Sequence, residues 1–171
     1  MQATAFENLP IANTPARGMV TFQVEQNPVA VIRSEGMSLL NAHWREVAQY
    51  PEVQVLDPDW QIYEQMERSG KLWVLTARDG GRLVGYIVMM LSRHLHYRSL
   101  TIAIDDIHFI HPDYRKGLTG YRMIRTTVKA MQALGVRMCT FRTKAAKDHG
   151  QLFRRLGFEP NDIVYAKILE R

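Results

Sequence analysis

Apolar residues along the chain follow two kinds of pattern, and the first of them predicts β-strands. Residues 20–26 alternate apolar and polar side chains, as a half-buried strand does. Residues 72–77 and 82–91 are apolar runs on either side of the Asp-Gly-Gly segment at 79–81, which has the composition of a hairpin turn. The strands predicted in this way are 20–26, 72–77, 82–91, 100–110, 136–142 and 163–169.

The second pattern places apolar residues three to four positions apart and predicts helices. The first helix should begin with Ser34 as its N-cap, after a break at Asn27 and Pro28. Asp57 can cap the next helix, because Pro58 would then occupy the first turn. The predicted helices are 34–50, 57–70, 119–134 and 145–156.

The order of these elements predicts the fold class. A strand, two helices, three strands of antiparallel type, and then helix, strand, helix and strand form an α/β (α+β) layer fold with a mixed sheet. The length of 171 residues suits one domain that can bury a core. Residues 1–18, with their prolines and asparagines, are expected to be a flexible N-terminal arm, and residues 19–171 a single domain.

Composition favours a protein of the cytoplasm. Hydrophobic residues make up 46% and charged residues 23% of the chain, as in an ordinary globular protein. No apolar run approaches the ~18 residues of a membrane span, so no membrane contact is expected. The N-terminus lacks the pattern of a secretory signal. A lone cysteine, Cys139, cannot form an internal disulfide, and its place in an apparent strand indicates a buried thiol in a reducing compartment.

The net charge of +5 is unevenly distributed. Residues 1–60 hold three Lys/Arg and seven Asp/Glu, whereas residues 111–155 hold eleven Lys/Arg and two acids. This asymmetry indicates a polyanionic partner for the second half of the chain. A nucleotide-type cofactor and a nucleic acid both meet that description, although no nucleic-acid-binding module pattern is present, which disfavours the second.

Residues 105–121 contain the strongest chemical signal. An apolar strand with Asp105 and Asp106 leads to Pro112, then to a basic turn with a glycine, and then to a helical pattern. A strand, turn and helix in that order leave backbone N–H groups at the helix N-terminus, where an anion can bind. The two carboxylates lie just upstream of that anion site.

Four landmarks resemble the GNAT superfamily of N-acetyltransferases: Val84-Gly85-Tyr86, Phe109-Ile110-His111-Pro112, the turn at 113–120 and Leu156-Gly157-Phe158. The resemblance covers about residues 34–169. It implies a GNAT-like, mixed and mostly antiparallel central sheet flanked by helices. It also implies transfer of an acetyl group from acetyl-CoA (coenzyme A) to a primary amine, by direct attack in a ternary complex.

The resemblance also implies where coenzyme A would bind. The family turn is Arg/Gln-x-x-Gly-x-Gly/Ala, and Arg115 and Gly120 match its ends. Its middle glycine is replaced by Leu118, and a glycine stands one place earlier, at Gly117. The general acid that many members supply as a tyrosine is replaced by Phe153. The cofactor-binding residues implied are Phe109, Ile110, Arg115, Lys116, Gly117, Leu118, Thr119, Gly120, Tyr121, His149 and Phe153.

A carboxylate or a water chain must accept a proton from the amine. The family often places an acid on this strand, and its spacing selects Asp106, with Asp105 as the fallback. Strand side chains alternate, so His108 should share the face of Asp106 unless a bulge shifts it, which makes it a second catalytic candidate. The acceptor is expected to contact Trp44, Tyr63, His96 and Tyr97. His94 and His96 could pair on a metal, but no cysteine or acid cluster completes a site, so no metal is expected.

Three functions remain open from the sequence. The leading one is an N-acetyltransferase acting on a small-molecule or peptide amine. A catalytically degenerate GNAT fold, acting as a CoA-binding or protein-interaction module, would explain Leu118 and Phe153. A nucleic-acid-associated protein is the third. The resemblance leaves a homodimer open as well.

Overall fold

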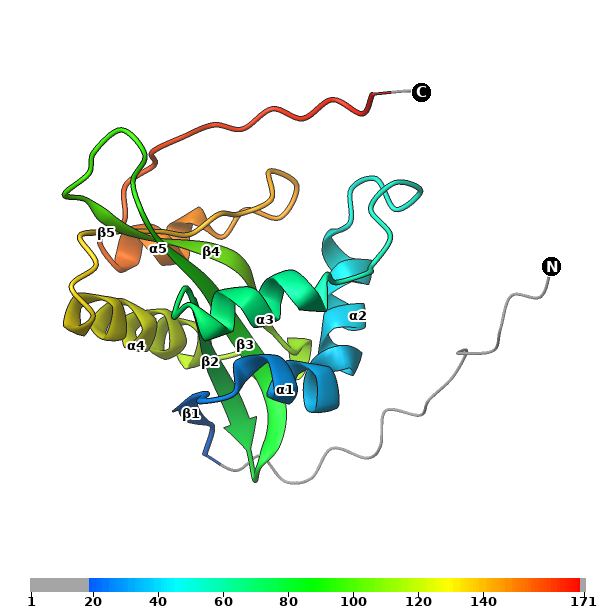
Figure 1. Cartoon of the computed structure of the whole chain (residues 1–171). Helices are drawn as coiled ribbons and strands as arrows, with labels where there is room; N and C mark the ends of the chain where they lie inside the picture. Colours follow the sequence, from blue (N-terminus) through cyan, green and yellow to red (C-terminus); the bar gives the residue numbers. More distant parts are fainter. Residues whose placement is uncertain (1–18, 170–171) are drawn as a thin grey trace.

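The computed structural model describes residues 19–169, so the arm expected at 1–18 lies outside the described part. Five strands form one sheet in the order β1-β2-β3-β4-β5 (Figure 1). Neighbouring strands are antiparallel except β4 and β5, which are parallel. The elements are β1 (Thr21–Val24), α1 (Pro28–Val31), a π-helical segment (Ile32–Gly36), α2 (Met37–Val47), α3 (Trp60–Arg68), β2 (Leu72–Asp79), β3 (Arg82–Arg93), β4 (Thr101–Ile110), a 3-10 turn (Pro112–Tyr114), α4 (Thr119–Ala133), β5 (Met138–Thr140) and α5 (Gly150–Arg155). This arrangement confirms the predicted fold class.

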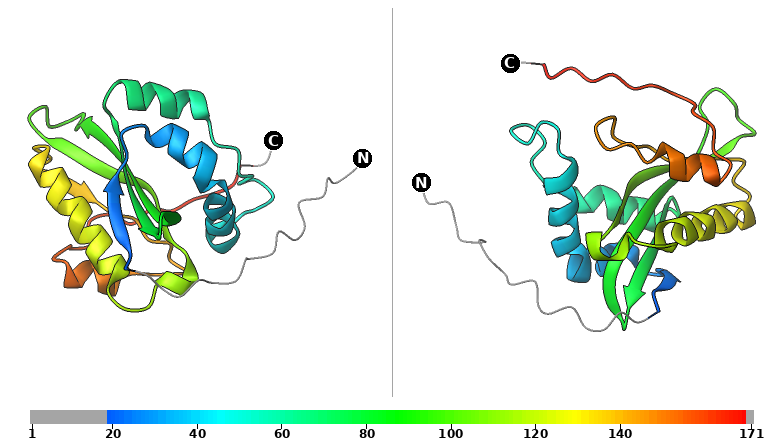
Figure 2. Two further views of the ribbon diagram at one scale, coloured as in Figure 1. Left: turned by 90° about the horizontal axis from the view of Figure 1, so that it is seen from below. Right: turned by 180° about the vertical axis from the view of Figure 1, so that it is seen from behind.

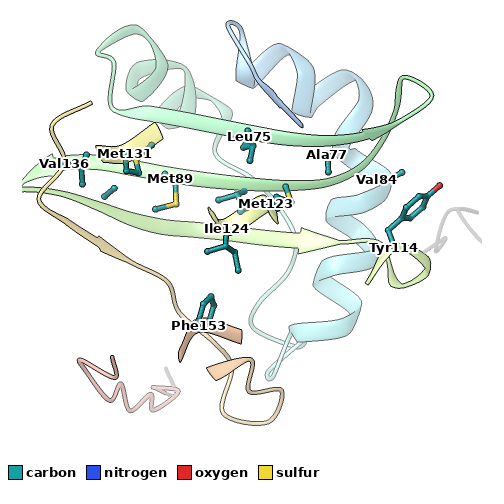
Figure 3. Packing of buried hydrophobic residues seen from close by; sticks show 12 residues of the cluster. Leu75, Ala77, Val84, Met89, Tyr114, Met123, Ile124, Met131, Val136 and Phe153 are labelled. Atoms are coloured by element: carbon teal, nitrogen blue, oxygen red, sulfur yellow. The ribbon is translucent and has the colours of Figure 1, made fainter. Parts of the chain in front are cut away.

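Helices cover both faces of the sheet. Helices α1, α2 and α3 lie on one face, and α4 and α5 lie on the other (Figures 1 and 2). Strand alternation divides the core accordingly: Leu75 and Met89 face α4 and pack with Met123 (Figure 3). Val74 and Tyr86 belong to the cluster on the side of α1–α3. Each fully buried aliphatic or methionine side chain contributes roughly 1.5–3 kcal/mol. Two clusters on opposite faces therefore hold the sheet in place.

The hairpin of β2 and β3 is the best predicted part of the sheet. Gly80 and Gly81 both have positive φ, at 56° and 85°, which is the conformation that a two-residue hairpin turn of type I′ requires. The adjoining strands pair from Asp79 and Arg82 to Leu72 and Met90. The predicted strands at 20–26, 72–77, 82–91 and 100–110 and the helix at 119–134 are confirmed with small shifts of their ends.

The N-terminal helices begin where the sequence did not predict. Pro28 is the first residue of α1 rather than a break, because a proline at this position loses no helical hydrogen bond. The hydroxyl of Ser34 donates to the carbonyl of Ala30 over 2.8 Å, so Ser34 lies inside the helical segment and its predicted capping role is wrong. Asp59, not Asp57, caps α3, since its carboxylate accepts a hydrogen bond from the backbone N–H of Ile62 at 3.1 Å.

The C-terminal part departs most from the sequence prediction. Residues 161–169 form no strand, and Ile163, Val164 and Tyr165 are 82–90% exposed, so the predicted closing strand at 163–169 is wrong. Alternation of apolar residues favours a strand, but a strand also needs an edge to pair with, and β5 is only Met138–Thr140 rather than 136–142. Helix α5 begins at Gly150 instead of 145, because the hydroxyl of Thr143 organises residues 143–149 as a turn.

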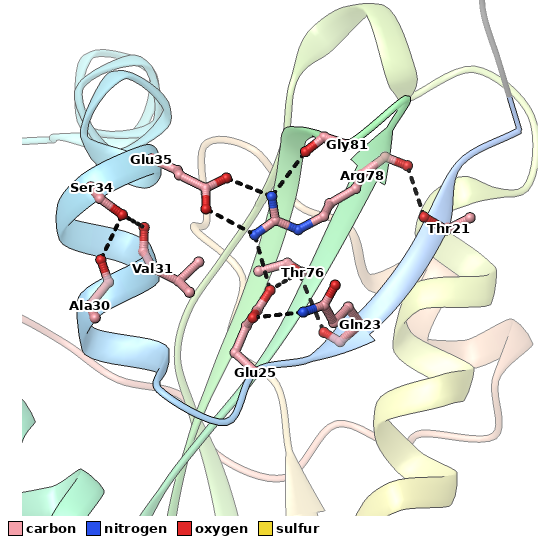
Figure 4. Close-up of polar contacts among 10 residues, drawn as sticks. All are labelled: Thr21, Gln23, Glu25, Ala30, Val31, Ser34, Glu35, Thr76, Arg78 and Gly81. Carbon is pink, nitrogen blue, oxygen red and sulfur yellow. Dashed lines mark hydrogen bonds and ion pairs between the residues drawn. The ribbon is translucent and has the colours of Figure 1, made fainter.

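An ion-pair network, buried at Glu25 and Arg78 and exposed at Glu35, joins β1, β2 and the π-helical segment (Figure 4). The Arg78 guanidinium donates to Glu25 at 3.2 Å and to Glu35 at 2.5 Å, and it also bonds the carbonyl of Gly81. The side chain of Glu25 is only 4% exposed and that of Arg78 only 13%. Thr76 completes the network by donating to Glu25 at 2.5 Å. This network fixes the entry of the chain into α1.

Within residues 19–169, no helix combines the length and the apolar character that crossing a membrane requires.

Candidate active site

The sheet opens between β4 and β5. The two strands pair only from Ile102–Ile104 to Met138–Thr140, so residues 105–110 of β4 extend beyond this ladder with β3 as their neighbour in the described chain. The register between β3 and β4 shifts after Met89, which pairs with Asp105, to Val88, which pairs with Ile107. Asp106 is therefore the extra residue of a β-bulge. Because of this extra residue, the side chains after Asp106 point to the faces opposite to those that strict alternation would give.

Asp105 holds the opening in shape. Its carboxylate accepts the backbone N–H of Arg142 at 2.9 Å and the Arg142 Nε at 3.3 Å. Arg142 also donates to the backbone carbonyls of Asp105 and Asp106. Asp105 is 2% exposed, so these bonds satisfy a carboxylate that would otherwise be costly to bury. Asp105 thus bridges the two diverging strands.

His108 lies on the same side as Asp105. Its Nδ1 donates to the carboxylate of Asp105 at 3.0 Å, and its ring meets those of Phe141 and Phe153 edge-on. His108 therefore does not share the face of Asp106, because the bulge at Asp106, the exception that the prediction allowed for, reverses the alternation. Asp105 orients the imidazole, which leaves Nε2 as the ring nitrogen that can exchange a proton.

Asp106 points to the opposite face, where it meets α3. The hydroxyl of Tyr63 donates to Asp106. Burial and this carboxylate raise the pKa of Tyr63 well above its usual range, so the hydroxyl stays protonated and keeps donating. Asp106 and Tyr63, which the sequence assigned to catalysis and to the acceptor, are thereby brought into one pair.

His43, on α2, lies beside the opening. Its Nδ1 hydrogen-bonds the hydroxyl of Tyr86 at 2.9 Å, and its ring stacks on Phe109 at 4.9 Å between centroids. Burial, together with the neighbouring His108, lowers the pKa of His43 to about 4, so the ring is neutral at neutral pH. On a helix with an apolar face a single histidine is not distinguished from a core residue. Only the register of β3 and β4 places it beside the opening.

The turn before α4 has the geometry of an anion site. Gly117 has φ of +84° and its Cβ position is open, whereas Leu118 has an ordinary φ of −104°. The glycine thus stands at the one position of this turn that needs it, which explains its shift from the family pattern. Leu118 is the N-cap, and no described side chain caps the helix, so the first N–H groups of α4 face outward. Arg115 and Lys116 precede these N–H groups.

Arg115 connects this turn to α2. Its guanidinium makes two bonds to Glu46, at 2.8 and 2.6 Å, and its Nε donates to the carbonyl of Ile110 at 2.8 Å. The guanidinium also lies 5.0 Å above the ring of Phe109. Lys147 reaches the same carboxylate at 3.6 Å, and these cations lower the pKa of Glu46. The turn before α4 and helix α2 are therefore linked by ion pairs across the opening.

The remaining predicted cofactor residues differ in accessibility. Phe153 is 7% exposed and packs among Phe141, Phe158 and His108, so it is part of the core. His149 is the exposed N-cap of α5, and its pKa is lowered by partial desolvation and by His108. Thr119, Gly120 and Tyr121 form the first turn of α4.

A cavity of about 360 Å³ lies between the sheet and helices α1–α3. Trp44 and Tyr63, both predicted to contact the acceptor, line it, together with His43. His96 and Tyr97 do not line it, because they lie in the exposed connection between β3 and β4. The structure thus brings together the predicted acceptor residues from α2 and α3 and leaves out those from the connection.

The thiol of Cys139 has no place in this chemistry. Burial raises the pKa of the Cys139 thiol to about 12, which suits the predicted structural thiol and not a nucleophile. Among the described residues, no group of three His, Cys, Asp or Glu side chains is arranged to hold a metal.

The site thus consists of the separated strands β4 and β5, the glycine turn that follows β4 and the uncapped start of α4. The same part of the chain matches a known protein family. The model of the acetyltransferase (GNAT) family matches residues 37–158. The chain belongs to the GNAT family. This confirms the predicted enzyme class, N-acetyltransferase, and the family uses acetyl-CoA as its acetyl donor. Comparison with curated proteins finds no match.

Solved structures support the GNAT fold. An aminoglycoside acetyltransferase from an uncultured soil metagenomic sample, in complex with sisomicin, matches with a TM-score of 0.66 and 13% identity, over 88% of this chain and 97% of that one. The ribosomal-protein-alanine N-acetyltransferase of Brucella melitensis biovar Abortus 2308 matches with a TM-score of 0.62 and 14% identity, over 90% and 100%. A predicted acetyltransferase of Clostridium acetobutylicum with acetyl-CoA has a TM-score of 0.61 and 8% identity, over 88% and 96%.

Proposed function

We propose that this GNAT protein transfers the acetyl group of acetyl-CoA to a primary amine by direct attack in a ternary complex. The observation that supports this most is the pairing of an anion-binding turn with a carboxylate across the opened strand. Gly117, with φ of +84°, and the uncapped start of α4 fit a pyrophosphate, and Lys116 adds positive charge, whereas Arg115 is paired with Glu46. When bound there, acetyl-CoA supplies an activated thioester.

The backbone of β4 has a part in this proposal. Residues 107–109 lie beyond the ladder with β5, and their outward backbone groups are open to an extended chain such as the pantetheine arm, whereas the carbonyls of Asp105 and Asp106 already accept from Arg142. Phe109 and Ile110 lie next to the Arg115 turn, because the Nε of Arg115 bonds the carbonyl of Ile110. A backbone N–H at this point would stabilise negative charge on an acyl oxygen.

Proton transfer is assigned to the face of α1–α3. The amine must lose a proton, and Asp106 accepts it in this proposal, either directly or through the hydroxyl of Tyr63, which already donates to Asp106. His108, oriented by Asp105 on the opposite face, is the second candidate for moving a proton. Phe153 has no proton to offer, so the departing thiolate takes its proton from water.

Acetyl-CoA should stabilise the folded chain by mass action, and Gly117 should control that effect. We expect Gly117→Ala to weaken acetyl-CoA binding about tenfold, because an L-residue at this φ costs roughly 1–2 kcal/mol and reshapes the turn. Gly70→Ala is the matched control, since Gly70 also has a positive φ of 65° with open space at its Cβ, but lies after α3. Isothermal titration calorimetry with acetyl-CoA measures both.

Equal affinities in the Gly117→Ala and Gly70→Ala variants would contradict this assignment of the turn. The absence of any acetyl-CoA binding by the wild-type chain would contradict the proposed function itself.

A further inference from the structure

The cavity beside the opening is apolar over most of its wall. Trp44 and Val47 from α2, Trp60 from α3 and Leu56 from the connection between these helices line it, and Val88 and Ile107 form its floor on the sheet. Its volume of about 360 Å³ is that of a small-molecule site. A wall of this kind favours a ligand with a hydrophobic body, because each apolar surface covered on binding is removed from water.

The polar groups on the wall are few. Among the described residues, the side chains with ionisable groups that line the cavity are His43, Asp57, Tyr63 and Lys144. His43 is neutral and hydrogen-bonded to Tyr86, and Tyr63 is protonated and hydrogen-bonded to Asp106. Asp57 lies on the exposed connection before α3. The wall therefore offers one exposed carboxylate and one ammonium group, Lys144.

A polycationic acceptor does not fit such a wall. Each ammonium group that enters an apolar cavity must find a carboxylate or lose its proton, because an unpaired buried charge is very costly. Lys144 would repel every further cation. A monoamine needs only one proton acceptor, and the apolar wall lowers its pKa and so favours the neutral form that attacks a thioester.

The hydrogen-bonded pair of Tyr63 and Asp106 sets the orientation of such a ligand in the cavity. Tyr63 lines the cavity and its hydroxyl donates to Asp106, which directly precedes the lining residue Ile107 on β4. His43 also lines the cavity, with its ring stacked on Phe109. Trp44 and Leu56 lie towards α2 and the connection. An amino group at Tyr63 thus leaves the hydrophobic body of the same molecule against the two helices.

We infer that the acceptor is a hydrophobic primary monoamine, with an aryl or alkyl body in the cavity and its amino group at Tyr63 and Asp106. The acetylation of the monoamine rests on the proposed function, whereas the binding of the monoamine in the cavity does not. It separates this chain from enzymes that act on polycationic amines, whose binding sites need several carboxylates.

Binding and turnover test the inference separately. 2-Phenylethylamine is the monoamine probe and spermidine the polycationic one. Titration of 2-phenylethylamine should change the intrinsic tryptophan fluorescence saturably, because Trp44 and Trp60 line the cavity. In a thiol-release assay with acetyl-CoA, kcat/KM for 2-phenylethylamine should exceed that for spermidine about 100-fold.

Ala48→Phe should fill part of the cavity from the C-terminal end of α2, where Ala48 is half-buried. We expect it to weaken 2-phenylethylamine binding at least about tenfold and to leave acetyl-CoA affinity unchanged. Ala133→Phe, at the exposed end of α4, is the matched control and should change neither.

The outcomes are distinguishable. Preferential turnover of spermidine, or unchanged 2-phenylethylamine binding in Ala48→Phe, would overturn the inference while the acetyltransferase function stands. Saturable binding of 2-phenylethylamine that Ala48→Phe weakens, without thiol release, would support the cavity assignment and overturn the proposed function. No fluorescence change with 2-phenylethylamine in the wild-type chain would overturn the inference whatever the turnover.

Discussion

Replacing Asp106 with Asn is expected to lower kcat about 10²- to 10⁴-fold, which is the usual contribution of a positioned proton acceptor. The amide keeps the shape of the carboxylate, and its oxygen can still accept the hydroxyl of Tyr63. It cannot take up a proton from the amine. The affinity for acetyl-CoA should remain the same, because Asp106 lies on the face of α1–α3 and the anion turn lies before α4.

The measurement is the steady-state rate of thiol release across a pH range, together with acetyl-CoA titration of the same variant. Asp113→Asn is the matched control, since Asp113 is 46% exposed and lies in the 3-10 turn. A kcat for Asp106→Asn within about twofold of wild type at every pH would reject Asp106 as the base and leave His108, oriented by Asp105, as the candidate.

Replacing Arg78 with Met is expected to destabilise the folded chain by about 3–5 kcal/mol, as removal of one partner of a buried ion pair does. The reason is the partner left behind: Glu25 has a side chain that is 4% exposed and would lose its cation. Glu35, whose pKa Arg78 lowers, would lose its partner too. Met retains most of the volume of the arginine stem, so the effect reports charge pairing more than packing.

Denaturant unfolding followed by circular dichroism gives the free energy of unfolding for this comparison. Arg68→Met is the matched control, because the Arg68 side chain is 67% exposed and pairs with Glu64 only at 3.9 Å. Exposed pairs of this kind are worth about 0–1 kcal/mol. Equal losses in the two variants would show that the network of Arg78 does not stabilise the entry into α1 in the way described.

Local signals were sufficient for the elements next to the site. The hairpin glycines at 80–81 and the glycine that ends α4, Gly135, each occupy a backbone conformation that their residue type indicates. Gly117 belongs to the same class, which is why the turn could be predicted although its glycine is displaced. The family resemblance then supplied the mixed, mostly antiparallel sheet flanked by helices around it.

The sequence predictions failed where the local structure depends on residues that lie far away in the chain. The bulge at Asp106 is a property of the pairing of β3 with β4, so alternation within one strand assigned His108 to the wrong face. Residues 163–169 have strand composition but no described edge to pair with. The contacts of His43 with Tyr86 and Phe109, which lie far from it in sequence, could not be predicted from its own helix.

Amine-dependent release of the coenzyme A thiol is the measurement that tests acetyl transfer most directly. The wild-type chain is incubated with acetyl-CoA and 2-phenylethylamine, and free thiol and N-acetylated amine are quantified together. The proposed mechanism predicts equal amounts of the two products, each requiring the chain and both substrates. Tight acetyl-CoA binding with no thiol release above the rate without the chain, for monoamines and polyamines alike, would contradict it and indicate a CoA-binding module instead.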